Sequence, residues 1–78
     1  MERVVVYLRT SLFTTGGPNA HLPTGVMILH GAVAPESSGS LRITVDRMED
    51  GRGKTLGDGP IVLQIPWGKV DHLEIVEA

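Results

Sequence analysis

The feature that most constrains this chain is a strict alternation of apolar and polar residues near its middle. In the segment 41–46, leucine, isoleucine and valine occupy the odd positions, and arginine, threonine and aspartate occupy the even ones. Successive side chains of a β-strand point to opposite faces of a sheet, so this pattern predicts a strand with one buried face and one solvated face. We therefore expect Leu41, Ile43 and Val45 to face a core.

Four further segments have the β-branched and apolar composition that is typical of strands. They cover residues 3–10, 25–34, 61–65 and 70–76. The second could also form a helix because it is continuously apolar, but its two glycines and the following Pro35 favour a strand. Gly31 in its middle predicts a bulge or a sharp bend. With long loops expected at 11–24 and 49–59, the sequence predicts an all-β fold of five short strands.

The length of the chain and its lack of cysteine predict a thin stability margin. A domain of 78 residues buries only about 60–65% of the surface that its unfolded chain exposes. The absence of cysteine excludes disulfides, and small domains without such links commonly gain stability by self-association. We therefore expect one domain over residues 1–78 that forms a homo-oligomer. Val5 and Tyr7 are the candidate oligomer contacts, because they lie on the second, largely apolar face of the first predicted strand.

The charge and hydropathy of the chain disfavour two classes of partner, nucleic acids and membranes. Seven basic residues against nine acidic ones give a formal net charge of −2, which disfavours binding of a phosphate backbone by net charge. The apolar run at residues 4–8 is shorter than the core of a signal peptide, and no segment approaches the roughly 20 apolar residues of a membrane span. We expect a cytoplasmic protein without a membrane partner.

The segment from Ile65 to Ile75 carries a resemblance to a known group of proteins. It reads Ile-Pro-Trp-Gly-Lys-Val-Asp-His-Leu-Glu-Ile and looks like the end of many small bacterial SH3-like or Sm-like proteins. In those proteins a short 3₁₀ turn joins the last two strands. The resemblance implies a small five-stranded antiparallel SH3-like or Sm-like barrel, with a 3₁₀ turn before the last strand.

The chain departs from the Sm pattern in two respects. Sm-family proteins usually open with a helix, whereas residues 3–10 predict a strand. The RNA-contacting motifs of that family, an aspartate-plus-asparagine turn and a late Arg-Gly, have no counterpart here, and Asp46 is followed by Arg47 and Met48. The RNA binding of the family therefore does not carry over to this chain.

Motifs for catalysis or metal binding fail when their spacing is checked. The segment 51–55, Gly-Arg-Gly-Lys-Thr, resembles the end of a phosphate-binding loop, but Met48 stands where that pattern needs its first glycine. His21, His30 and His72 do not have metal-ligand spacing, and His30, in an apolar run, is expected to be half-buried and hydrogen-bonded. No serine has a histidine or an acid at the spacing of a known nucleophile motif. We therefore expect no enzyme, no metal and no cofactor.

The sequence favours a non-catalytic binding or assembly module, a small self-associating barrel that presents its loops to an unidentified protein or small ligand. The alternative is an RNA-binding Sm-like barrel. In that case Arg52 and Lys54 would contact phosphate, and Phe13 or Trp67 would stack on bases. These four residues are the candidate partner-binding residues. Nucleic acid is the less favoured partner because acidic residues are interleaved with the basic ones between residues 49 and 58.

Overall fold

The computed structural model of this protein describes residues 2–12, 23–33 and 39–77. Five strands make one antiparallel sheet with the order β4-β3-β2-β1-β5. The strands are β1 (Glu2–Leu12), β2 (Val26–Val33), β3 (Ser40–Glu49), β4 (Thr55–Pro66) and β5 (Val70–Glu77). One 3₁₀ turn, η1 (Trp67–Lys69), joins β4 to β5, and the described residues contain no α-helix. The predicted all-β fold, with five antiparallel strands and a 3₁₀ turn before the last one, is confirmed.

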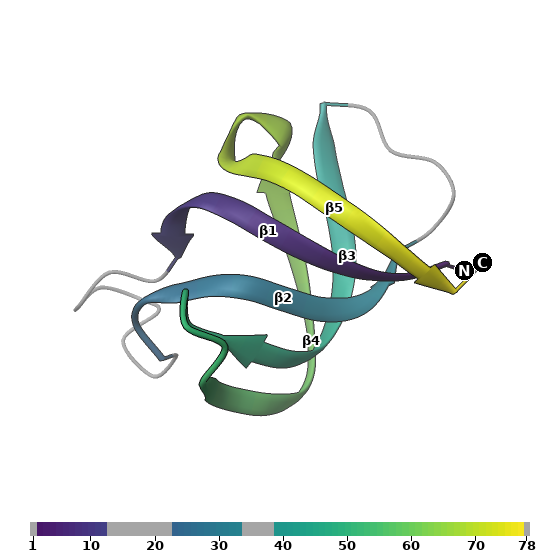
Figure 1. Ribbon diagram of the computed structural model, residues 1–78. Helices are drawn as coiled ribbons and strands as arrows, with labels where there is room; N and C mark the ends of the chain where they lie inside the picture. Colours follow the sequence, from purple (N-terminus) through teal and green to yellow (C-terminus); the bar gives the residue numbers. More distant parts are fainter. Residues whose placement is uncertain (1, 13–22, 34–38, 78) are drawn as a thin grey trace.

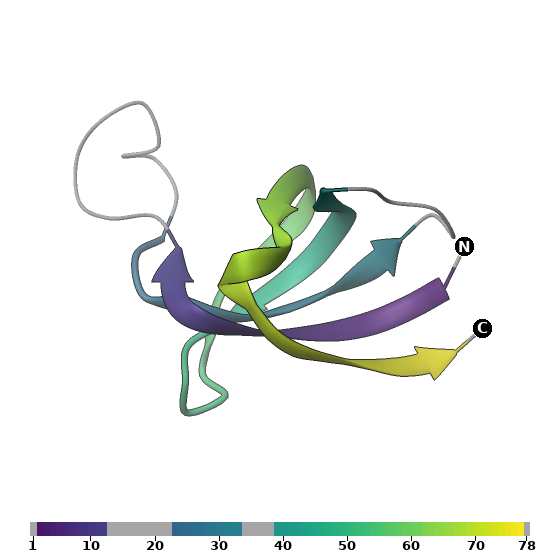
Figure 2. The ribbon, with the colours of Figure 1, turned by 90° about the horizontal axis from the view of Figure 1, so that it is seen from above.

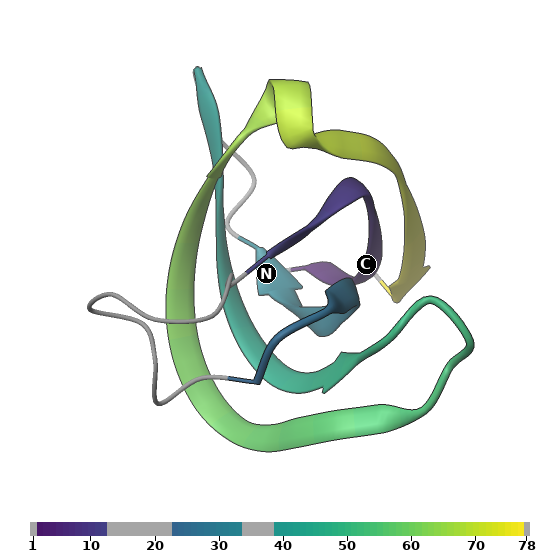
Figure 3. The ribbon, with the colours of Figure 1, turned by 90° about the vertical axis from the view of Figure 1, so that its left-hand side faces the viewer.

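The sheet is strongly curved and encloses one core. In Figure 1, β1 and β5 cross over β3 and β4, and Figures 2 and 3 show the sheet curling back on itself. This curvature lets side chains from one face of all five strands meet. The buried cluster consists of Val4, Val6, Leu8, Val26, Leu29, Val33, Leu41, Ile43, Val45, Met48, Ile65 and Val70. The prediction that Leu41, Ile43 and Val45 face a core is therefore confirmed.

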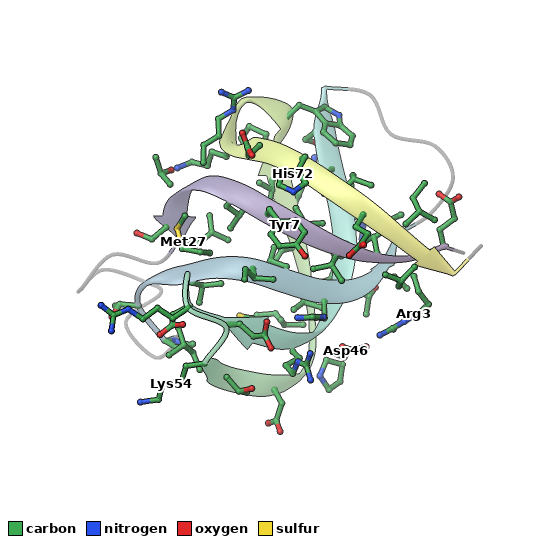
Figure 4. The ribbon with its side chains drawn as sticks, viewed as in Figure 1. Arg3, Tyr7, Met27, Asp46, Lys54 and His72 are labelled. Carbon is green, nitrogen blue, oxygen red and sulfur yellow. The ribbon has the colours of Figure 1, made fainter. Side chains whose placement is uncertain are left out.

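A bulge, one of the two features predicted at Gly31, is present at this point of the pairing between β2 and β3. The pairing of β2 with β3 shifts by one residue between His30 and Gly31, so that Asp46 of β3 is the extra residue of a bulge. Bulges increase the local twist and bend of a strand, and here the bulge lies in the middle of the sheet. The Asp46 carboxylate points out of the sheet and pairs with the Arg3 guanidinium at 2.7 Å (Figure 4).

The long loop predicted at 49–59 is wrong. β3 continues to Glu49 and β4 begins at Thr55, so only residues 50–54 connect the two strands. Gly57 and Gly59, which contributed to the predicted loop, lie instead in an irregular strand, whereas Gly51 and Gly53 lie in the connection. The register shifts twice along this half of β4, and Gly59 there has a φ of 95°, a backbone conformation that other residues rarely adopt. β1 likewise runs to Leu12, past its predicted end at residue 10.

Candidate functional site

The turn between β3 and β4 presents two of the candidate binding residues. One carboxylate oxygen of Asp50 accepts the backbone N–H groups of Arg52 and Lys54, each at 2.9 Å. The backbone closes the same turn, because the Gly53 N–H donates to the Asp50 carbonyl at 3.0 Å. The N–H of Lys54, followed by that of Arg52, lowers the pKa of the Asp50 carboxyl below its ordinary value. The turn therefore holds both basic side chains in solvent, close to one carboxylate.

Trp67, a third candidate binding residue, does not complete a site at this turn. Trp67 is 38% exposed and belongs to η1, the short coil between β4 and β5 at the top of Figure 1. Lys54 lies at the lower left of the molecule seen from the same side, away from η1 (Figure 4). Phe13 lies outside the described residues. The structure thus does not bring Trp67 next to the basic turn.

The predicted oligomer contacts lie on the outer face of the sheet. Val5 is only 8% exposed although it is not part of the main core. Tyr7 is half-buried, and its ring stacks on that of His72 with centroids 4.5 Å apart and an interplanar angle of 13° (Figure 4). The His72 Nδ1 in turn lies 2.8 Å from a carboxylate oxygen of Asp71. Neighbouring strands therefore cover much of Val5 and Tyr7 within a single chain.

A polar cluster on the outer face joins β2 to β3. The Nε2 of His30 lies 2.9 Å from one carboxylate oxygen of Glu49, and Arg47 lies 3.3 Å from the other. His30 is half-buried and hydrogen-bonded, as the sequence predicts. Sequence spacing alone could not reveal this cluster, because the strand register brings together residues 19 positions apart. Since the two carboxylate oxygens of Glu49 contact His30 and Arg47, the arrangement resembles a structural polar cluster more than an open acid–base site.

Comparison with known protein families, with curated proteins and with solved structures finds no match for this chain. Its site must therefore be argued from its own residues. Within the described ranges no three histidines or acids gather in a way that could hold a metal ion. In the same ranges no helix has both the length and the apolar character needed to cross a membrane.

Among the described residues, most of the exposed large apolar side chains lie on the two outermost strands of the sheet. They are Val62 of β4, and Ile75 and Val76 of β5; Trp67 of η1 is the fourth. Within the part of the chain that the structure describes, β4 and β5 each have a strand neighbour on one side only. Ile75 is opposite the core residue Val4 in the register, yet it is 56% exposed, because no described strand covers the free side of β5. Sequence reasoning missed this surface, since its existence depends on the strand order.

Proposed function

We propose that this chain is a non-catalytic binding or assembly module, a small SH3-like or Sm-like barrel that works as a homo-oligomer. The observation that carries the proposal is that, among the described residues, exposed apolar side chains (Val62, Ile75 and Val76) lie on the two edge strands. An edge strand offers unpaired N–H and C=O groups, which makes it a template for pairing with another chain. Apolar side chains on such an edge add buried area when a partner strand binds.

The small size of the domain supports the same proposal. A chain of 78 residues without cysteine gains stability most directly by burying apolar surface against another copy. Val5 offers little area for this purpose because it is already buried, whereas Val62 and Val76 are each 54% exposed. The edges are therefore a better supported contact surface than the outer face around Val5 and Tyr7.

The mass of the full-length chain in solution tests this function. Light scattering behind size exclusion, over a concentration series that reaches about 100 μM, should report a defined multiple of the chain mass, because oligomers dissociate by mass action on dilution. Addition of nuclease should leave that mass unchanged if no nucleic acid holds the assembly together. A monomer at every concentration would contradict the proposal.

RNA binding is the less supported alternative. It needs basic side chains beside aromatic ones, since stacking and phosphate contacts act together on a single strand. Arg52 and Lys54 share their turn with the Asp50 carboxylate, and the described aromatic residues Tyr7 and Trp67 lie on other elements. We therefore keep RNA as an outcome to be tested and not as the proposed ligand.

A further inference from the structure

The C-terminal half of β4 forms an edge of the sheet that is uncharged and regularly paired. From Ile61 to Ile65 the chain reads Ile-Val-Leu-Gln-Ile, without a charged residue. Its register with β3 is unbroken over these five residues, whereas the preceding half of β4 is irregular. β3 is the only strand that pairs with this segment among the described residues. A regularly paired, uncharged and apolar edge of this kind is the type that accepts an added strand.

The opposite edge of the sheet lacks these properties. The pairing of β5 with β1 shifts twice, and Asp71 and Val76 are the residues left without an opposite partner. β5 also carries the exposed acidic residues Asp71 and Glu74. Bulges and charges are the features by which edge strands avoid pairing with other chains. The structure therefore offers one open edge, at β4, and one protected edge, at β5.

We propose that a second copy of this chain occupies the open edge, by antiparallel pairing of Ile61–Ile65 with the same segment of the partner. This inference rests on the proposed function, which requires self-association but does not say which edge is used. The two-fold axis would pass at Leu63. Pro60 and Pro66 lie three residues on either side of it. Because proline has no backbone N–H to donate, the two prolines delimit a symmetric pairing of five residues.

The side chains of the segment are compatible with pairing to themselves. About an axis at Leu63, Val62 of one copy lies opposite Gln64 of the other on the outer face. On the core side, Ile61 lies opposite Ile65. No like charges lie opposite each other in this pairing. The half-exposed Val62 side chain of each copy becomes partly buried against the other copy. In this arrangement, Asp58 of one copy and Lys69 of the other lie at the same end of the interface. These two side chains carry opposite charges.

Two valines of equal exposure provide a matched test. Val62 on β4 and Val76 on β5 are each 54% exposed, at opposite edges of one sheet. In full-length protein, Val62→Lys should convert the dimer into a monomer, and Val76→Lys should leave the dimer intact. Far-UV circular dichroism of both variants should remain that of the wild type, which shows that loss of the dimer is not loss of the fold.

Each other result of this pair has a defined meaning. Loss of the oligomer in Val76→Lys alone would overturn the proposal in favour of the β5 edge. Loss in both variants, with a wild-type mass above that of a dimer, would overturn it in favour of head-to-tail pairing of β4 with β5. An oligomer that survives both substitutions would place the interface elsewhere and leave self-association standing. A monomeric wild type would overturn the proposed function together with this inference.

Cysteine cross-linking tests the register without relying on loss of binding. The chain has no cysteine of its own, so Val62→Cys and Gln64→Cys each carry a single thiol. Residues opposite each other in an antiparallel pair are close enough for a disulfide. An equimolar mixture of the two variants should therefore form a cross-linked heterodimer under mild oxidation, in at least about tenfold excess over either variant alone. Equal cross-linking in all three samples would contradict an axis at Leu63.

Discussion

Gly31 of β2 lies so close to Thr44 of β3 that a Cβ atom at position 31 would overlap the Thr44 carbonyl oxygen. The overlap is with backbone, which cannot move aside as a flexible side chain can. This contact lies at the bulge where the register of β2 and β3 shifts. The close approach of the two backbones at this point is therefore part of what bends the sheet around its core.

We predict that Gly31→Ala is among the most damaging single changes in this protein. The added methyl group must displace β3, and overpacking of this kind costs about 3 kcal/mol of unfolding free energy. Urea denaturation followed by circular dichroism measures the change. Gly68→Ala is the control, because a Cβ atom there meets nothing within 4 Å, and its effect should stay within about 0.5 kcal/mol. Equal losses of unfolding free energy in the two variants would show that the contact between Gly31 and the Thr44 backbone does not determine the effect.

Truncation of apolar side chains should distinguish the enclosed core from the exposed edge of the sheet. Ile43 is fully buried and Ile75 is 56% exposed. Ile43→Ala should lower the free energy of unfolding by about 3 kcal/mol, a large share of the stability of so small a domain. Ile75→Ala should change it by less than about 1 kcal/mol in dilute, monomeric protein. Similar losses of unfolding free energy at both positions would mean that the Ile75 side chain is buried in solution.

The turn at Asp50 should respond to acid in a defined direction. Its carboxyl group accepts two backbone N–H bonds, and these bonds are stronger when the group is charged, so the pKa in the folded chain lies below the ordinary value of 3.8. The unfolded chain therefore binds this proton more readily, and the stabilisation from Asp50 is complete above about pH 4 and is lost as the pH falls through the folded pKa. An NMR titration of the Asp50 carboxyl carbon should give a midpoint below 3.8.

Two variants check that the hydrogen bonds within the turn cause the lowered pKa of Asp50. Asp50→Ala removes the acceptor, so amide hydrogen exchange at Arg52 and Lys54 should accelerate at neutral pH. Asp50→Asn keeps one side-chain oxygen and should retain part of the protection, without the titration. A carboxyl midpoint at or above 3.8 in the wild type would contradict the predicted direction.

We predict that the protein does not bind RNA with useful affinity. Backbone binding draws its strength from counterion release as basic residues neutralise phosphates, and this chain has seven basic residues against nine acidic ones. Fluorescence anisotropy with mixed single-stranded RNA at physiological salt should give a dissociation constant no tighter than about 10 μM. Salt-sensitive, sub-micromolar binding that disappears in the double variant Arg52→Ala/Lys54→Ala would instead favour the RNA alternative.

Local patterns were enough to predict much of the fold. Alternation at Leu41, Ile43 and Val45 identified their buried face, because side-chain direction in a strand is a property of neighbouring residues. Gly31 predicted the bulge because a residue without a side chain permits two backbones to approach closely. The local pattern misled at residues 55–59, where Gly57 and Gly59 lie in an irregular strand and not in a loop. Pairing with β3 overrode the loop preference of those residues.

The candidate surfaces were less accessible to sequence reasoning. Arg52 and Lys54 do share an exposed turn, as their spacing suggested, but Trp67 lies on another element. The stacking of Tyr7 on His72 joins residues of β1 and β5 that are far apart in the chain. No local signal encodes this contact, because it depends on which strands become neighbours.

The sequence by itself determined that this chain forms five strands, which residues of the third strand are buried, and where the pairing of the second strand is irregular. These properties follow from nearest-neighbour sterics and from the two-residue period of a strand. Only the tertiary structure decided that Val5 is 8% exposed while Val62 and Val76 are 54% exposed, although all three are valines in segments that the sequence predicts as strands. The physical reason is strand order. Val5 has a strand on each side, whereas Val62 and Val76 lie on the two outermost strands, and strand order is set by pairing between distant segments.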